Sequence, residues 1–318
     1  MLRIYRDLTG PCLAPAGCVL TIGAFDGLHR GHQALLARVR ERAQARGLVP
    51  AAVSFEPLPR GYFAPTPVKR LSAVREKLCG FAAAGIELLL LLRFGARLAS
   101  MSAEDFVREV LVARLAAREI WVGKDFRFGH HRIGDVELLR TLEGVGGYTV
   151  RVLDAVTQGD GERISASRVR GALGSGDFAH ASELLGRPFA ISGHVVHGQQ
   201  LGRTLGYPTA NIRLGKRVSP IGGIFAVRVR TGTAWLPGVA SLGVRPTIAG
   251  AGEPLLEVHL FDFDGDLYGH RLEVQFVAKL RDEEKFADLT ALRAQMDRDA
   301  AAARRVLADT PTASGALA

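Results

Sequence analysis

The sequence predicts an α/β half followed by a β half: a Rossmann-like parallel sheet, then a small antiparallel β-barrel with a C-terminal helix. Over about the first 155 residues, short apolar runs alternate with segments of helical period, as in a parallel sheet covered by helices. From Arg187 onward the apolar period falls to two, which is typical of antiparallel strands. The segment 283–307 returns to a helical period.

The strands expected in the first half are apolar at nearly every position, so we expect both faces of that sheet to be buried. These strands are 19–25, 49–55, 86–94, 119–123 and 148–154. Helices are expected at 32–47, 70–85, 102–115, 164–173 and 177–186. The alternating strands of the second half are 194–198, 225–232, 235–243, 255–263 and 270–280.

Length and composition are those of a compact protein with about two domains. The chain has 318 residues, of which 47% are hydrophobic, enough for two buried cores. We expect a cytoplasmic location, because no run of about 18 apolar residues could span a membrane and no signal-peptide pattern opens the chain. The three cysteines, Cys12, Cys18 and Cys79, are odd in number and lack CxxC spacing, so we expect them to be reduced.

The formal net charge of +9 favours anionic partners. The arginines are spread along the chain, with no block of like charge and no basic motif interleaved with aromatic residues. Small phosphorylated ligands are therefore favoured over a nucleic-acid track.

Three unusual loops follow strands of the expected parallel sheet. They are 23–32, 55–63 and 123–132, rich in glycine, arginine or proline. Ligands of open parallel sheets bind beyond the carboxyl ends of the strands. We therefore expect the three loops to meet at one cleft.

The first of these loops, GAFDGLHRGH, has the features of a phosphate site. Gly23, Gly27 and Gly31 surround His29 and His32, which lie about one helical turn apart at the start of the expected helix. Free backbone N–H groups at a helix start bind anions. For the histidines alone, surface residues beside a glycine turn would be the simpler interpretation; a zinc site would need a third ligand.

The same stretch resembles the FDGxHxGH signature of the nucleotidyltransferase superfamily. From near residue 18 to about residue 300, the chain resembles the bacterial bifunctional riboflavin kinase/FAD synthetase family. The other stretches that carry the resemblance, in the family's order, are FEPLPRGYF, RLSAVREKL, GKDFRFG, ISASRVR, GRTLGYPTAN, LGVRPT and LEVHLFDFDGDLYG. The resemblance implies a nucleotidyltransferase sheet followed by a riboflavin-kinase-type barrel.

For the first half, the resemblance implies adenylyl transfer from ATP to FMN, with His29 and His32 binding the ATP phosphates. The full set of ATP- and phosphate-binding residues implied here also includes Gly23, Phe25, Asp26, Gly27, Gly31, Arg127, Ser165, Ser167, Arg168 and Arg170. The family pattern has a third hydroxyl where this chain has Ala166. From the residues alone, Arg127 is favoured as functional, whereas Phe128 is as readily a core residue.

In the second half, Thr209 and Asn211 are two apart, so both point to one face of an extended chain. Their oxygens could hold Mg²⁺ together with ATP; turn chemistry at a strand edge explains the spacing equally well. The resemblance favours the metal, because PTAN is the family's kinase signature. The implied ATP- and flavin-binding residues of this half are Gly198, Gly202, Gly206, Pro208, Thr209, Asn211 and Arg281.

Glu257 alternates away from the apolar face of its strand. From the residues alone, a solvated carboxylate is the simpler interpretation. The resemblance makes Glu257 the general base toward the primary ribityl hydroxyl of riboflavin, which attacks the γ-phosphate of ATP. His259 is expected to be structural, and Ser241 stands where the family usually has Asn. An exposed arginine is the simpler interpretation of Arg281.

The stretch DFDGD has calcium-loop spacing, but Leu267 replaces the required glycine and a strand follows it. We expect a hairpin turn at Asp264-Gly265 instead.

Together with these patterns, the resemblance implies an FMN adenylyltransferase domain at 1–186, a riboflavin kinase domain at 187–305 and a disordered tail at 306–318. Both activities would use ATP and Mg²⁺, with riboflavin, FMN and FAD as substrates or products; neither a membrane nor nucleic acid is the expected partner. Two alternatives stay open: a riboflavin kinase whose adenylyltransferase activity is weakened or absent, and a basic nucleic-acid-binding flavoprotein.

Overall fold

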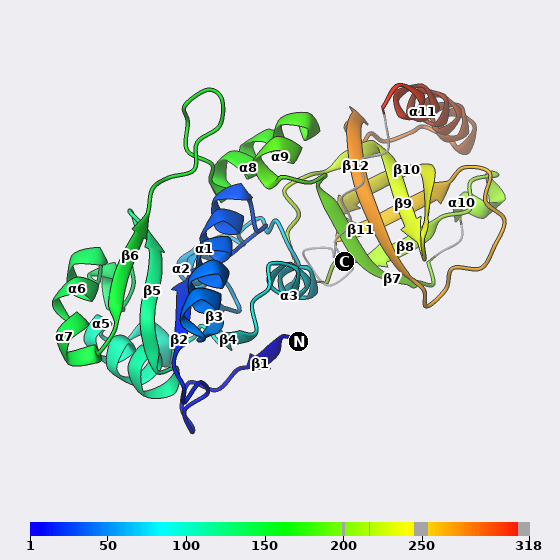
Figure 1. Ribbon diagram of the computed structural model, residues 1–318. Coiled ribbons are helices and arrows are strands. Elements are labelled where there is room, and N and C mark those ends of the chain that lie inside the picture. Colours follow the sequence, from blue (N-terminus) through cyan, green and yellow to red (C-terminus); the bar gives the residue numbers. More distant parts are fainter. Residues whose placement is uncertain (199–200, 216, 245–253, 311–318) are drawn as a thin grey trace. The chain divides into compact units, whose positions relative to one another are not determined.

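The computed structural model describes residues 1–198, 201–215, 217–244 and 254–310. Contacts divide the chain into two compact units, each of which can be followed in Figure 1. The first unit comprises Met1–Val68 and Val74–Ser165, and the second comprises Lys69–Ala73 and the chain from Ala166 onward. The functional boundary expected at residue 186 stays a prediction.

The first unit is built on the expected parallel sheet, with strand order β1-β4-β3-β2-β5-β6. The strands are β1 (Arg3–Tyr5), β2 (Cys18–Ile22), β3 (Val49–Phe55), β4 (Leu88–Leu92), β5 (Ala117–Gly123) and β6 (Thr149–Leu153). The short edge strand β1 was not predicted, since three partly exposed residues carry no periodic signal.

The helices of this unit include the three that the sequence predicts. They are α1 (Arg30–Arg46), α2 (Pro59–Phe63), α3 (Val74–Ala83), α4 (Ala96–Ala99), α5 (Ala103–Asp105), the π-helical η1 (Phe106–Arg114), the 3₁₀ turn η2 (His130–Arg132), α6 (Val136–Thr141) and α7 (Glu143–Gly146). The helix expected at 102–115 is therefore one turn of α-helix followed by a π-helical segment.

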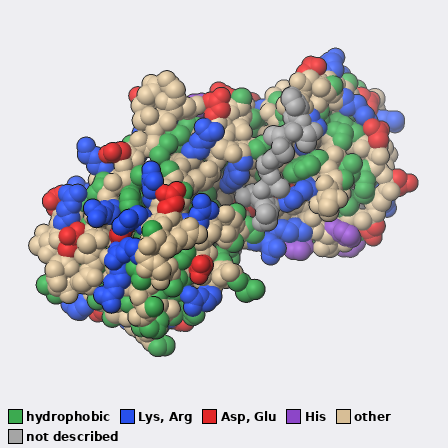
Figure 2. Space-filling view, in the orientation of Figure 1, with side chains coloured by type: hydrophobic (Ala, Val, Ile, Leu, Met, Phe, Trp, Pro, Cys, Tyr) green, Lys and Arg blue, Asp and Glu red, His purple; other side chains and the backbone are tan. Residues whose placement is uncertain are grey.

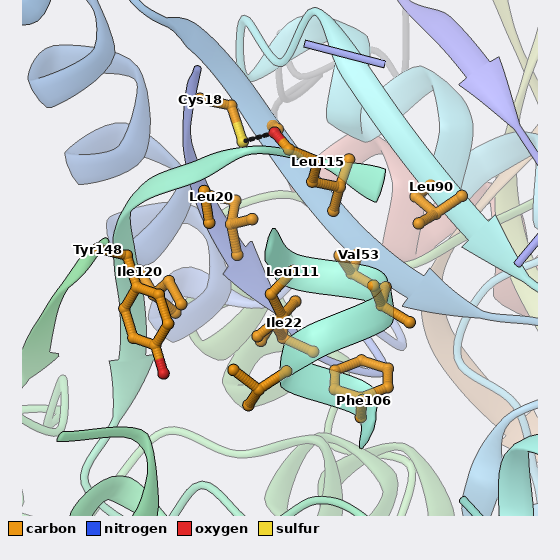
Figure 3. Packing of buried hydrophobic residues seen from close by; sticks show 14 of the residues in the cluster. Cys18, Leu20, Ile22, Val53, Leu90, Phe106, Leu111, Leu115, Ile120 and Tyr148 are labelled. Carbon is orange, nitrogen blue, oxygen red and sulfur yellow. Dashed lines mark hydrogen bonds between the residues drawn. The ribbon is translucent and has the colours of Figure 1, made fainter. Parts of the chain in front are cut away.

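Two apolar clusters cover the two faces of the sheet, because neighbouring residues of each strand point to opposite sides. Leu20 belongs to the cluster that contains Leu111 of η1 (Figure 3), whereas Val19 belongs to the cluster that contains Leu36 of α1 and Phe81 of α3. This packing leaves the carboxyl ends of the strands at an edge between the two clusters, where the three unusual loops begin.

The second unit contains α8 (Ala166–Gly174), α9 (Phe178–Leu185) and a closed barrel, which confirms the predicted β half. The barrel order is β10-β11-β8-β7-β12-β9. Its strands are β7 (Ala190–Val196), β8 (Ala210–Arg213), β9 (Gly223–Thr231), β10 (Ala234–Val244), β11 (Pro254–Leu260) and β12 (Arg271–Arg281). A short helix, α10 (Leu201–Thr204), lies between β7 and β8.

The hairpin expected at Asp264-Gly265 is wrong. Strand β11 pairs with β10 and β8, whereas β12 pairs with β7 and β9, so the loop 261–270 connects strands that are not neighbours. A local turn signal gives the position of a reversal but does not specify which strands pair across it.

The last helix, α11 (Leu289–Asp309), packs Ala303 and Leu307 against Ala226 and Phe261 of the barrel. It begins later than the expected residue 283, because Asp288 caps its first turn by accepting a hydrogen bond from the Ala291 amide at 2.8 Å. Residues 306–309, expected to be disordered, are helical and are followed by the C-cap residue Thr310; residues 311–318 of the expected tail lie outside the described residues.

Candidate functional site

The loop between β2 and α1 has a tightly turned backbone. Phe25 (φ 49°), Gly27 (φ 79°) and Leu28 (φ 47°) are left-handed, a conformation that bulky residues such as Phe25 and Leu28 rarely adopt. Helix α1 starts at Arg30, and the side chain of its N-cap residue, His29, makes no capping hydrogen bond. The N-terminal amides of this 17-residue helix face the end of the loop, where an anion could accept hydrogen bonds from them.

His29 and His32 lie together at this helix start, as the sequence predicts. Their rings stack with centroids 3.7 Å apart, and the His32 ring lies 4.9 Å from the ring of Phe25. His29 is only 6% exposed. Gly31 permits this approach, since a Cβ there would lie 3.2 Å from Nδ1 of His29. The loop thus presents two imidazoles as one unit.

Burial lowers the pKa of His32 well below its usual 6.5, and the charges of His29, Lys77 and Arg163 lower that pKa further. The His32 ring is therefore neutral at pH 7, and its buried Nδ1 has no hydrogen-bond partner among the described residues. A site of this kind disfavours a further positive charge and stabilises an anion. A bound phosphate would supply the missing partner.

The segment before α8 lies beside the histidines, since the carbonyl of Ile164 is 3.6 Å from the position that a Cβ of Gly31 would take. Ser165 follows directly, at the end of the first unit. Ser167, Arg168 and Arg170 lie on α8 in the second unit. Their predicted contact with the same nucleotide stays a prediction.

Those two arginines have partners within the second unit. Arg170 donates from Nε to the carbonyl of Lys69 at 2.7 Å, and Arg168 lies 3.5 Å from Nε2 of His180. The contact of Arg170 ties the short segment Lys69–Ala73 to α8.

A cavity of about 790 Å³ lies at the carboxyl edge of the same parallel sheet; we call it the aromatic cavity. It begins at Ile22, the last residue of β2, and is lined by loops that follow β3, β4 and β5. Its aromatic residues are Phe55, Phe63, Phe94, Phe106, Phe126 and Phe128. A flat aromatic ring would fit such a wall.

Arg127 lines the aromatic cavity and forms an ion pair with Asp135 at 3.0 Å. Phe128 is 8% exposed and both packs in the core and lines the cavity, so neither of its two interpretations excludes the other. The predicted meeting of loops at one cleft is confirmed for 55–63 and 123–132, which contribute Phe55, Phe63 and Phe126 to this cavity. Phe94, in the loop after β4, and Phe106, on η1, were not predicted, because no spacing connects them with those loops.

In the barrel, a cavity of about 290 Å³ brings together Gly202, Thr209, Glu257 and Arg281; we call it the barrel cavity. A second cavity of about 560 Å³, the loop cavity, is lined by Pro208, Thr209 and residues 263–268. Thr209 lines both cavities. Thr209 therefore stands where two ligands could meet.

Asn211 and Glu257 are direct register partners on β8 and β11. Asn211 is 4% exposed, and its Oδ1 accepts no hydrogen bond from a described residue. Gly198 lies against this amide, since a Cβ there would be 2.5 Å from Nδ2 of Asn211. Gly202 is equally close to the carbonyl of Tyr207, at 2.3 Å. Gly198 and Gly202 thus allow close contacts within the protein, whereas their contact with a ligand stays a prediction.

Polar contacts fix the walls of the barrel cavity. Arg281 donates to Asp299 of α11 from Nε at 3.0 Å and from Nη2 at 2.7 Å, and this hydrogen-bonded ion pair raises the pKa of Arg281. Ser241 donates to Glu283 at 3.2 Å. His259 contacts the carbonyl of Pro208 through Nδ1 at 2.9 Å, in agreement with a structural role.

Tyr207 donates its hydroxyl to Asp297 of α11. Burial, followed by that hydrogen bond, raises the pKa of Tyr207 to about 12. The segment from Gly202 to Pro208, with Gly206 left-handed at φ 87°, is therefore held to α11 by a neutral phenol.

Comparison with known proteins gives two family matches, one in each half. The FAD synthetase family matches residues 13–168, and the riboflavin kinase family matches residues 185–307. A bifunctional riboflavin kinase/FMN adenylyltransferase of Pseudomonas fluorescens is 48% identical over 96% of this chain and 98% of its own length. The protein of that name from Escherichia coli K12 is 45% identical over 95% and 97%.

A solved structure from Streptococcus pneumoniae, described as a macrolide-efflux protein, is 30% identical and covers 98% of this chain and 99% of its own, with a TM-score of 0.81. In the part of the chain that the structure describes, none of the helices has the length and apolar character needed to cross a membrane.

Fold, site and comparisons together define the class: an enzyme with two units that each transfer a phosphate-containing group. The chain belongs to the bifunctional riboflavin kinase/FMN adenylyltransferase family.

Proposed function

We propose that the first unit transfers the adenylyl group of ATP to FMN, and that the barrel phosphorylates riboflavin to FMN. The observation that carries this assignment is the grouping of chemically matched residues in each unit: the stacked His29 and His32 at the start of α1, and Thr209 between two cavities, one of which contains Glu257. The cytoplasmic location expected from the sequence stays a prediction.

In adenylyl transfer, a phosphate oxygen of FMN attacks the α-phosphorus of ATP, and the bond from that phosphorus to the bridging oxygen breaks to release pyrophosphate. The negative charge that develops on the phosphate oxygens falls at the start of α1, where His29, His32 and the helix amides can donate to it. Because the ring of His32 is neutral, it would donate a hydrogen bond to the phosphate without giving up its proton. The aromatic cavity supplies a wall for the flavin ring.

In the kinase reaction, the primary ribityl hydroxyl of riboflavin attacks the γ-phosphorus of ATP, and ADP leaves. Glu257 faces the barrel cavity and would accept the proton of that hydroxyl. The barrel cavity would hold riboflavin, and the loop cavity would hold ATP. Because Thr209 lines both cavities, the phosphoryl group would be transferred from ATP to riboflavin beside this residue.

Thr209 and Asn211 fit a divalent cation. The buried Oδ1 of Asn211, which no described residue satisfies, is the kind of oxygen that Mg²⁺ binds. Mg²⁺ bound there would neutralise charge on the ATP phosphates. Asn211 itself is held in place by donating from Nδ2 to the carbonyl of Thr209 at 3.3 Å.

A product assay on the full chain tests the assignment. Given riboflavin and ATP with Mg²⁺, the wild type is expected to form FMN and then FAD. The double variant His29→Ala/His32→Ala should form FMN without FAD, whereas Glu257→Gln should make FAD only from supplied FMN. His194→Ala, at an exposed barrel position, is the matched control.

The reverse pattern of losses, or the loss of both products in each variant, would contradict the residue assignment. FMN without FAD from the wild type would favour the kinase-only alternative, which the missing hydroxyl at Ala166 motivates. The nucleic-acid alternative has no support from the surface in Figure 2, where Lys and Arg side chains are interspersed with acidic and uncharged ones. Salt-sensitive nucleic-acid binding without ATP turnover would revive that alternative.

A further inference from the structure

Lys77 is a charged side chain with no exposed surface. It lies on α3, two residues after the exposed Arg75. Its relative exposure is 0%, a value that few lysines reach because the ammonium group loses its hydration. A buried ammonium is stable only where several acceptors surround it. Its position therefore needs a local explanation.

The acceptors of Lys77 belong to two functional loops. Its Nζ donates to the carbonyl of Ala24 at 2.9 Å and to the carbonyl of Phe55 at 3.2 Å, and Oε2 of Glu56 lies 3.9 Å away. Ala24 lies in the loop that leads to His29 and His32, and Phe55, at the end of β3, lines the aromatic cavity. Ser54 also donates to Ala24, at 3.3 Å.

This contact joins the carboxyl ends of two neighbouring strands. Strands β2 and β3 are neighbours in the sheet, so the ammonium bridges their carboxyl ends. One loop leads to His29 and His32, and the other leads into the aromatic cavity. A shift of one loop relative to the other would move the ATP phosphates relative to the flavin.

The charge of Lys77 also acts on the histidine pair. It is one of the positive groups that hold the pKa of His32 down, after burial and His29 and before Arg163. Acidic residues adjoin both groups in sequence: Glu76, which is 4% exposed, directly precedes Lys77, Glu56 lies beside the ammonium, and Asp26 belongs to the histidine loop. Among these carboxylates, Lys77 supplies a buried positive charge that acts on the histidine pair.

We propose that Lys77 is a positioning residue for adenylyl transfer, whose buried ammonium holds the histidine loop against the loop that begins the aromatic cavity. Lys77 touches neither reacting group, so it acts through the two backbone carbonyls. A misplacement of about 1 Å in an active site can cost about 100-fold in rate, so loss of this link should affect kcat more than binding.

The test compares Lys77→Met with Arg75→Met in the full chain. The first removes the buried charge and the second removes an exposed charge from the same helix. Lys77→Met should lower kcat for FAD formation from FMN by about 100-fold while KM for ATP and FMN changes much less. Riboflavin phosphorylation by the same molecules should be unchanged. Arg75→Met should be wild-type in both reactions.

Wild-type kcat for FAD formation in a folded Lys77→Met protein would overturn the role. Should Lys77→Met fail to fold, Lys77→Arg provides the test. Arginine keeps the positive charge, but its longer, planar group cannot lie between the same two carbonyls. We therefore expect kcat for FAD formation to fall at least tenfold in Lys77→Arg. A Lys77→Arg protein with wild-type kcat would also overturn it.

Because this role rests on the proposed adenylyl transfer, one measurement is independent of turnover. NMR titration of His29 and His32 should show displaced imidazole signals and a higher pKa for His32 in Lys77→Met, with no change in Arg75→Met. Identical titrations in all three proteins would contradict the role of Lys77 but not the proposed adenylyl transfer. A wild type that makes no FAD, with titrations that do differ, would contradict only the proposed function.

Discussion

Asn211 and Glu257 lie directly opposite one another on β8 and β11, in a register that also pairs Leu256 with Ile212. The buried amide oxygen of Asn211 and the carboxylate of Glu257 thus come from adjacent strands of a closed barrel, which holds them rigidly. Rigid placement suits groups that must act on one phosphoryl transfer, because the reacting atoms then need little reorganisation.

Removing the amide oxygen of Asn211 should weaken the use of Mg²⁺ by the kinase. Asn211→Leu keeps the branched shape of this 4%-exposed residue but offers no ligand oxygen. We expect the Mg²⁺ concentration for half-maximal FMN formation to rise about tenfold or more. Asn211→Asp, which keeps an oxygen, should reach half-maximal FMN formation at a lower Mg²⁺ concentration than Asn211→Leu. Equal Mg²⁺ dependence in the wild type and Asn211→Leu would exclude the residue as a ligand.

Replacing Gly198 with alanine should impair the kinase, because the added methyl group would contact the side chain of Asn211. Its Cβ would lie 2.5 Å from Nδ2 of Asn211, so the amide must move. Gly198→Ala should therefore lower kcat for riboflavin phosphorylation, by about tenfold or more, without changing FAD formation from supplied FMN. Gly222→Ala is the matched control, because its Cβ would meet only the carbonyl of Leu242, at 3.6 Å. Equal kinase rates in the two variants would contradict the expectation.

Ser241 is expected to shape the wall that faces riboflavin. Its hydroxyl donates to Glu283 at 3.2 Å, and across the sheet it is the register partner of Glu257. Ser241→Ala removes a hydrogen bond of about 1 kcal/mol, which corresponds to about a fivefold higher KM for riboflavin. Steady-state FMN formation measures this change, and an unchanged KM would show that Glu283 does not depend on Ser241.

Much of the fold could be predicted because its signals are local and periodic. The strand Leu88–Leu92 is buried at every position, as the continuous apolar run at 86–94 indicates. The alternation around Glu257 likewise gives the face of β11 correctly, since Leu256 and Val258 are buried. The paired histidines follow from their spacing at a helix start.

Non-local features could not be predicted from single-residue patterns. The loop 261–270 shows a turn signal, but the pairing of β11 with β8 depends on closure of the whole barrel. Lys77 lies within the helix expected at 70–85, and no pattern in that stretch distinguishes it from the other charged residues. Its acceptors at Ala24 and Phe55 become neighbours only in the folded sheet.

The buried histidine predicts how the stability of the first unit depends on pH. His32 has a pKa near 6.5 when unfolded and a lower pKa when folded, chiefly because of its burial. Between these two values the unfolded state binds more protons. The stability that the neutral ring contributes is therefore complete above about pH 6.5 and is lost as pH falls toward the folded pKa, by at most about 1.4 kcal/mol per pH unit.

Urea unfolding between pH 5 and pH 7.5 measures this slope. The chain has two tryptophans, Trp121 in the first unit and Trp235 in the second, so a Trp235→Phe background makes fluorescence report the first unit alone. In that background, His32→Gln should flatten the loss of unfolding free energy below pH 6.5, whereas His270→Gln in the barrel should not. Equal slopes in the two variants would mean that folding does not lower the pKa of His32, and the neutral ring would then contribute no pH-dependent stability.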